Sequence, residues 1–181
     1  MIGSCAENGM PVVSANDAYV RYDVEEKLQL AAEKCEAYRL MGYHCSESSI
    51  RACSEVLDIK LPEEILRISS AFRGGGGGYG DRCGVVEAGM MLIAYRYGRI
   101  DPKVDVSDYS YLIRLLHERF LKELGSFDCR VLRPFAYYLS GEARNCSHVY
   151  KKGAAIVTKL LLEADELIKA MPESERYRKP T

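Results

Sequence analysis

Residues 72–97, FRGGGGGYGDRCGVVEAGMMLIAYRY, are the stretch around which the rest of the chain is organised. From Val85 to Tyr97 the residues are apolar on all sides apart from Glu87 and Arg96, and they show no strict alternation. An apolar segment of this length without a polar face is typical of a helix buried in a core. The stretch therefore predicts a glycine-rich loop followed by a buried central helix.

Cys83 stands where this loop enters the predicted helix. Unpaired backbone N–H groups and the positive end of the helix dipole favour the thiolate there, which makes Cys83 a candidate ligand or nucleophile. Glycine residues can adopt positive φ and bring N–H groups close to an anion or a cluster. The candidates for that role are Gly74, Gly75, Gly76, Gly77, Gly78 and Gly84. A flexible surface loop that ends in a cysteine is the alternative.

Length and charge limit the classes of function. A chain of 181 residues with a net charge of −1 is most simply one domain that buries its own core. Charged residues make up 28% and are mixed in sign, so we expect neither nucleic acid nor an anionic membrane as a partner. The first residues lack a basic start and an apolar segment, and no stretch is apolar enough to insert into a membrane. We expect a cytoplasmic protein.

Seven cysteines is an odd number, and it occurs here without a secretory signal. This favours reduced thiols, metal ligation or redox chemistry over a framework of structural disulfides. The positions of the cysteines relative to the helices must decide among these uses.

Helical periodicity predicts an all-α bundle of about six helices in a single domain. They run from about Val24 to Gly42, Cys45 to Leu57, Leu61 to Phe72, Val85 to Gly98, Tyr109 to Gly125, and Cys146 to Ala170. Phe127 opens a short segment that ends before Pro134, and no strand is predicted. Residues 1–22 have turn composition and are expected to form an N-terminal arm, residues 23–171 the domain, and residues 172–181 a polar tail.

Cys45, Cys83, Cys129 and Cys146 share one feature, because each stands where a loop enters a helix or a short helical segment. Cys5, Cys35 and Cys53 do not: Cys5 is incidental to the arm, and the other two are small core residues. Four converging thiolates could bind a soft metal, hold an iron–sulfur cluster or exchange disulfides. The spacing contains no Cys-x-x-Cys pair and matches no zinc-finger or ferredoxin run, so ordinary thiols remain the alternative.

The sequence resembles the family of redox-active proteins named for the pattern Cys, Gly-Cys-Ala-x-x-Gly, Cys, Cys, which also occurs as a domain in haem proteins of the split-Soret type. The match extends over about residues 25–167. It is carried by residues 42–47, residues 72–80, Cys83-Gly84, residues 90–98, residues 127–132 and Cys146. The sequence departs from the family after Cys83, where Val85 and Ala88 fill small-residue positions. The resemblance implies a cysteine-based redox or iron–sulfur role for Cys45, Cys83, Cys129 and Cys146, without naming a substrate.

Other residues are weaker candidates. His44 and His148 lie close to Cys45 and Cys146 in sequence and are candidates for alternative metal ligands or proton donors. A histidine beside a helix start is, however, more often a capping or surface residue. Glu87 is either an acid of raised pKa or, as we prefer, the partner of a nearby arginine, the choices being Arg82, Arg96 and Arg130. A group of tyrosines is explained by packing along helix seams. It comprises Tyr95, Tyr97, Tyr109, Tyr111, Tyr137 and Tyr138.

Two functions follow from these observations. In the preferred one, the four cysteines form a shared centre for electron transfer or thiol redox chemistry, and an unknown redox protein is the partner. The cofactor is then an iron–sulfur cluster or another thiolate-bound metal, iron or zinc, or else there is none and the centre is a dithiol. In the alternative, the chain is a non-enzymatic interaction module that could form a homodimer. Its cysteines then pack in the core or bind a structural zinc ion.

Overall fold

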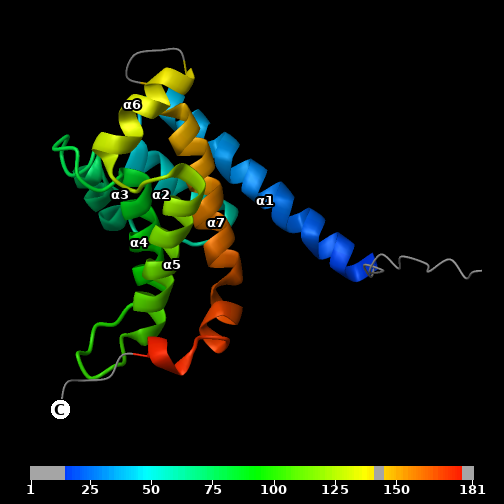
Figure 1. Cartoon of the computed structure of the whole chain (residues 1–181). Coiled ribbons are helices and arrows are strands. Elements are labelled where there is room, and N and C mark those ends of the chain that lie inside the picture. Colours follow the sequence, from blue (N-terminus) through cyan, green and yellow to red (C-terminus); the bar gives the residue numbers. More distant parts are fainter. Residues whose placement is uncertain (1–14, 141–144, 177–181) are drawn as a thin grey trace, which may run out of the picture.

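Seven α-helices and two short 3-10 helices make up the computed structural model, which describes residues 15–140 and 145–176 (Figure 1). The α-helices are α1 (Ala15–Leu40), α2 (Cys45–Val56), α3 (Glu63–Ser69), α4 (Gly84–Tyr97), α5 (Ser107–Leu124), α6 (Cys129–Ser140) and α7 (Ser147–Lys169). The described residues form no strand, and their one isolated β-bridge joins Arg82 to Asp128. The predicted all-α class is confirmed.

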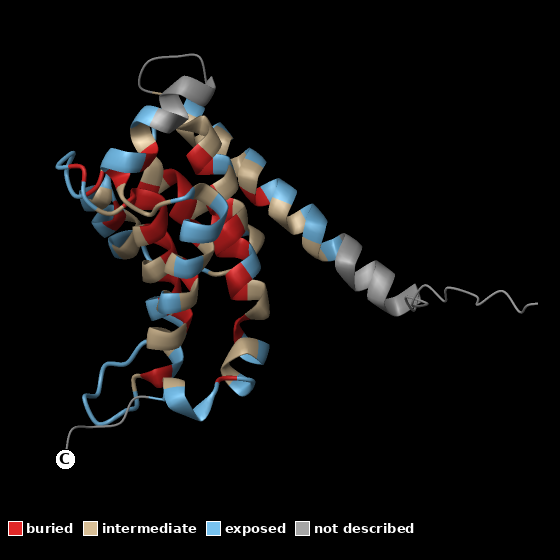
Figure 2. Cartoon of the chain, in the orientation of Figure 1, coloured by how far each residue is buried: buried red, intermediate tan, exposed pale blue. Residues whose placement is uncertain are grey.

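Helix α4 lies at the centre of the bundle, in contact with α2, α5 and α7. Most of its first three turns is buried, including Val85, Leu92 and Ile93, whereas Met90 and Met91 are half-buried and Tyr95 in the last turn is exposed. The surrounding helices contribute Ile50, Leu112, Leu116, Phe120, Val157 and Leu160 to the same core. Figure 2 shows this core as buried residues in the middle of the molecule. The prediction of a buried central helix is therefore confirmed.

Helix α1 begins nine residues earlier than the expected start at Val24, so residues 15–22 are helical and the turn structure expected for them is wrong. Asn16 belongs to the turn composition of this segment, but residues of its type also stabilise the start of a helix. The described part of α1 before Ala31 contains no buried residue. This half of the helix extends away from the bundle (Figure 1). Residues 1–14 of the predicted arm lie outside the described residues.

Helix α6 continues through Pro134, where the short segment was expected to end. A proline in a helix removes one backbone hydrogen bond, and here the helix continues beyond Pro134 without that bond. The helix extends to Ser140, and residues 141–144 lie outside the described residues. In the predicted polar tail, Glu173–Glu175 form a 3-10 turn, and residues 177–181 are not described.

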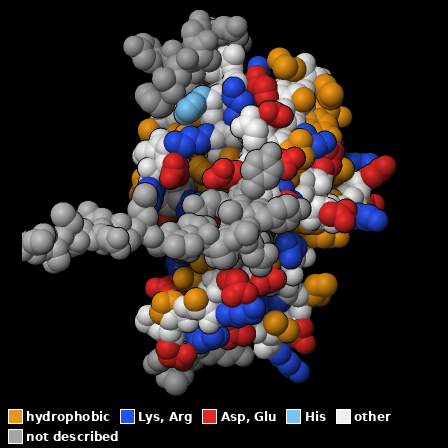
Figure 3. Space-filling view, turned by 90° about the vertical axis from the view of Figure 1, so that its right-hand side faces the viewer, with side chains coloured by type: hydrophobic (Ala, Val, Ile, Leu, Met, Phe, Trp, Pro, Cys, Tyr) orange, Lys and Arg blue, Asp and Glu red, His pale blue; other side chains and the backbone are white. Residues whose placement is uncertain are grey.

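Positive and negative side chains are interspersed on the face shown in Figure 3. This agrees with the near-zero net charge of the chain. Within the described residues, no helix combines the length and the apolar character needed to span a membrane.

Candidate functional site

All four cysteines singled out in the sequence line one cavity of about 580 Å³. Cys45 and Cys129 are the first residues of α2 and α6, and Cys83 and Cys146 directly precede α4 and α7. Figure 1 shows α6 and the beginning of α7 at the upper end of the bundle. The cavity is thus built from helix beginnings that lie far apart in the sequence.

Cys45 is placed by a tight reversal between α1 and α2. Gly42 has a φ of +98°, a conformation that glycine adopts without strain, and its N–H donates to the carbonyl of Arg39. The backbone N–H of His44 then donates to the Glu47 carboxylate, which caps α2. The Cys45 sulfur accepts a hydrogen bond from the N–H of Gly74 at 3.4 Å. The glycine-rich loop therefore contacts the site through its first glycine.

Gly84 brings α4 against the same sulfur. A Cβ atom on Gly84 would lie 2.5 Å from the Cys45 Sγ and 2.8 Å from the Phe72 carbonyl oxygen. No side chain fits at this position without displacing backbone or the site sulfur. Gly84 therefore holds Cys45 beside the start of α4, where Cys83 lies.

A short antiparallel pairing joins the chain before α4 to the chain before α6. The Cys83 N–H donates to the carbonyl of Phe127 at 2.9 Å, and the Cys129 N–H donates to the carbonyl of Asp81 at 2.7 Å. Arg130 N–H completes the pairing by donating to Gly80. These backbone bonds hold the two segments that carry Cys83 and Cys129 side by side, although 46 residues separate the cysteines in sequence.

Cys146 enters the cavity together with Tyr150, which the sequence analysis did not single out. Tyr150 is 8% exposed and lines the cavity one helical turn after Cys146. Burial raises the pKa of its hydroxyl, as do the nearby Cys45 and Cys146 thiols, so the group stays a neutral donor. The i, i+4 spacing from Cys146 is the signal that would have found this residue.

Three arginines also line the cavity, and no aspartate or glutamate is among the lining residues. They are Arg39 at the end of α1, Arg73 before the glycines and Arg133 in α6. Arg39 is paired with Glu36 at 2.7 Å. The lining is therefore cationic, which favours negative charge on the sulfurs or on a group that they bind.

The other glycines of the loop do not approach the cysteines. All five have positive φ, as expected, but Gly76, Gly77 and Gly78 are exposed, and a Cβ on Gly76 or Gly77 would meet open space. Gly75 is buried, and there a Cβ would lie 2.5 Å from the backbone nitrogen of Asp81. The expectation that the whole run walls the site is wrong, because the left-handed turn leads the chain out to solvent and back.

The expectation that helix starts favour thiolates is also wrong for the metal-free protein. Burial raises the pKa of the Cys83 thiol, and the neighbouring Cys45 raises it further, whereas the Val85 N–H lowers it. Burial likewise raises the pKa of the Cys45 thiol, although hydrogen bonds from the N–H groups of Gly74, Ser46 and Gly84 lower it. Burial also raises the pKa of Cys129, and the nearby Arg133 lowers it. Desolvation therefore opposes the helix starts at these three cysteines, and a bound cation would favour their ionised form.

These raised pKa values predict how the stability of the metal-free protein depends on pH. Above the ordinary thiol pKa of 9.0, the unfolded chain releases protons that the folded chain retains on Cys83 and its neighbours. The free energy of unfolding should therefore fall as pH rises, by about 1.4 kcal/mol per pH unit for each retained proton. Urea unfolding between about pH 7.5 and 10 measures this slope. Cys83→Ser should make the dependence of the unfolding free energy on pH shallower. An unchanged slope would contradict the raised pKa of the Cys83 thiol.

Cys35 and Cys53 are core residues, as the sequence predicted. Cys35 and Cys53 are fully buried, Cys35 beside the Ser49 hydroxyl at 3.4 Å and Cys53 donating to the carbonyl of Ala154 at 3.6 Å. Cys5 lies outside the described residues. No disulfide joins any two of the described cysteines. Neither Cys35 nor Cys53 lines the cavity.

Of the weaker candidates, His44 lines the cavity and His148 does not. Glu87 pairs with Arg82 at 3.7 Å, as we preferred, and burial raises the pKa of its carboxyl although Arg82 lowers it. Tyr95 and Tyr97 donate to the Lys60 carbonyl and to Asp165, which are structural contacts. The side chains of Tyr137 and Tyr138 lie outside the described part of the structure.

The geometry tests which groups the site could hold. Among residues 15–140 and 145–176, no three His, Cys, Asp or Glu side chains lie close enough to bind one metal ion. The described residues therefore form no closed mononuclear metal site.

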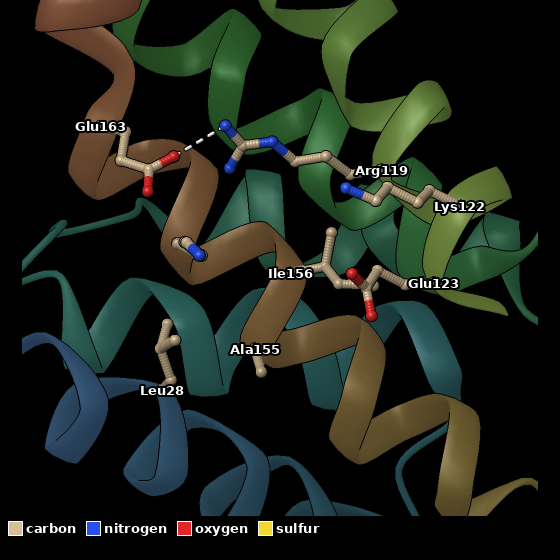
Figure 4. Close-up of a pocket in the computed structure, with 8 residues that line it drawn as sticks. Leu28, Arg119, Lys122, Glu123, Ala155, Ile156 and Glu163 are labelled. Carbon is tan, nitrogen blue, oxygen red and sulfur yellow. Dashed lines mark ion pairs between the residues drawn. The ribbon is translucent and has the colours of Figure 1, made fainter. Parts of the chain in front are cut away.

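A second surface cavity, of about 470 Å³, lies between α1, α5 and α7 (Figure 4). Its charges are partly paired, with Arg119 bound to Glu163 at 2.7 Å, and no cysteine or histidine lines it. It offers neither a nucleophile nor a soft ligand. The cavity with four cysteines is the better candidate for chemistry.

Residues 43–160 match the model of a family described as "Putative redox-active protein (C_GCAxxG_C_C)". This match covers more than half of the chain, and the chain belongs to that family of redox-active proteins. The matched region begins just before Cys45 and includes all four cysteines of the cavity. No curated protein and no solved structure matches the chain.

Proposed function

We propose that the protein transfers electrons through an iron–sulfur cluster held by Cys45, Cys83, Cys129 and Cys146. The convergence of these four cysteines on one cavity carries the proposal. Four cysteine thiolates are the usual ligand set of such clusters, and a bound cluster exchanges electrons with a partner. The family description supports redox activity and names no centre.

The surrounding residues suit an anionic centre that must be kept from water. The N–H of Gly74 points at the Cys45 sulfur, and hydrogen bonds to ligand sulfurs make reduction easier. Arg73 and Arg133 supply positive charge that offsets ligand thiolates. Leu132 and Val149 close the apolar side of the cavity and are each 3% exposed.

Anaerobic purification followed by an absorption spectrum with metal and sulfide analysis tests the proposal. We expect visible absorption that bleaches on reduction, together with iron and acid-labile sulfide. A colourless protein with stoichiometric zinc would favour the structural alternative instead. A metal-free protein that forms a reversible disulfide would make the centre a dithiol, for which Cys83 and Cys129, on two segments joined by backbone hydrogen bonds, are the first candidates. The cytoplasmic location, the redox partner and a homodimer stay predictions.

A further inference from the structure

We propose that Tyr150 is a positioning residue whose hydroxyl donates a hydrogen bond to a ligand sulfur of the centre and raises its reduction potential. This inference rests on the proposed function, because it names a residue that tunes the centre formed by the four cysteines. The position of the hydroxyl, its burial and its free hydrogen-bonding capacity each support it.

Helix α7 carries Tyr150 into the cysteine cavity. The N–H of Tyr150 donates to the carbonyl of Cys146 at 3.0 Å, so the two residues lie one helical turn apart. Large side chains on a helix point back toward the preceding turn, which directs the ring toward the start of α7. Burial raises the pKa of the hydroxyl, and so do the nearby thiols of Cys45, Cys146 and Cys83. The hydroxyl therefore lies among sulfurs that come from three different helix starts.

Tyr150 differs from the other hydrogen-bond donors of the cavity in being buried. Its side chain is 8% exposed. Apart from the cysteines, the other described lining residues with donor side chains are exposed or half-buried, namely Arg39, Tyr43, His44, Arg73 and Arg133. A hydrogen bond to a charged acceptor is stronger where water is excluded. Among these donors, Tyr150 is thus the one with the largest expected effect on a thiolate.

The hydroxyl of Tyr150 has donor capacity to spare. Within the described part of the chain it forms no hydrogen bond, although a buried tyrosine hydroxyl usually has a partner. A neutral thiol is a weak acceptor, whereas a thiolate accepts a charge-assisted bond. The cysteines become good partners for this hydroxyl when they bind a metal centre as thiolates.

Close packing holds the ring in place. On the same helix, Val149 and Ala154 are 3% and 0% exposed. A Cβ atom on Gly153 would lie 2.7 Å from Val85 Cγ1, so α7 packs tightly against the first turn of α4. Because Cys83 directly precedes that turn, the hydroxyl and the centre cannot easily move apart. A donor fixed in this way needs no rearrangement when the charge on the sulfurs increases.

A redox titration of the anaerobically purified, cluster-containing protein tests the inference. Reduction adds negative charge to the centre, and a hydrogen bond to a ligand sulfur stabilises that charge. For Tyr150→Phe, we expect the ratio of reduced to oxidised centre at a given applied potential to fall about tenfold, which is a downward shift of about 59 mV for a one-electron couple. The melting temperature should change little, because phenylalanine retains the packed ring.

A second variant and a control separate the hydrogen bond from simple loss of packing. Replacement of Tyr150 by 3-fluorotyrosine retains the hydroxyl and makes it a better donor, so the potential should rise instead of fall. Tyr97→Phe is the control, because its hydroxyl donates to Asp165 at 2.8 Å and Tyr97 does not line the cavity. This variant should keep the wild-type potential.

Equal potentials for the wild type, Tyr150→Phe and the fluorotyrosine protein, each with full iron content, would overturn the role of Tyr150 while the proposed function stands. If Tyr150→Phe loses its iron, the fluorotyrosine protein decides, since a potential that does not rise there contradicts the hydrogen bond. A wild type without iron and without visible absorption would overturn the proposed function itself.

Discussion

Replacement of Cys83 by serine is expected to abolish the redox centre. The Cys83 side chain is 6% exposed, it directly precedes α4, and its backbone is bonded to the segment that carries Cys129. A serine hydroxyl is nearly isosteric but is a hard, weakly acidic ligand that cannot replace a thiolate on a soft metal. The visible absorption and the iron content after anaerobic purification should both fall to background.

Cys53→Ala is the control for this variant. It also removes a fully buried thiol, but one that donates to the carbonyl of Ala154 in the core. We expect a loss of about 1–2 kcal/mol in the free energy of unfolding, with iron content and absorption retained. Full iron content in a folded Cys83→Ser protein would show that Cys83 is not a ligand.

The second large effect is expected from Gly84→Ala. Gly84 has helical geometry, so alanine alone should stabilise the helix by about 1 kcal/mol. The new Cβ would instead lie 2.5 Å from the Cys45 Sγ and 2.8 Å from the Phe72 carbonyl. Because the backbone oxygen cannot rotate away, the sulfur must move. We expect most of the cluster to be lost and the reduction potential of the remainder to shift, as measured by metal analysis and redox titration.

Gly89→Ala, on the same helix, separates this effect from simple crowding. There the added Cβ would lie 2.8 Å from Leu116 Cδ2 and 2.9 Å from Val157 Cγ2, both in the core. Overpacking of this kind should cost about 1–3 kcal/mol of stability and leave the centre intact. Gly76→Ala, whose Cβ meets open space at a φ of +77°, should likewise retain the cluster. If Gly84→Ala kept the wild-type potential, the close packing of α4 on Cys45 would have no part in the chemistry.

The sequence predicted most of the helices because their buried faces repeat with the helical period. It placed the central helix within a residue of its observed bounds, since an all-apolar run of that length has few other solutions. It failed at Pro134, where a local rule about proline was overridden by the packing of α6 against α7. It also failed at residues 15–22, whose composition suits both a turn and the first turn of a helix.

Some residues of the candidate site could likewise be predicted from the sequence, and others could not. Cys45, Cys83, Cys129 and Cys146 were found because a helix start is a local feature that can be located from sequence. Arg73 and Arg133 were missed because they meet only after α6 folds over the loop, and no periodicity relates them. The role of the glycines was only partly predicted, because positive φ follows from the residue type but the direction of the turn does not. The raised thiol pKa values follow from burial, which depends on the tertiary fold.

The central claim is that one centre is shared by four cysteines from four helix starts. It is tested most directly by anomalous diffraction at the iron edge from crystals of the anaerobically purified protein. The account predicts anomalous density from more than one iron inside the cavity, with each of the sulfurs of Cys45, Cys83, Cys129 and Cys146 about 2.3 Å from one of the irons. Iron located elsewhere, or density in which any of these four sulfurs has no iron at bonding distance, would contradict it.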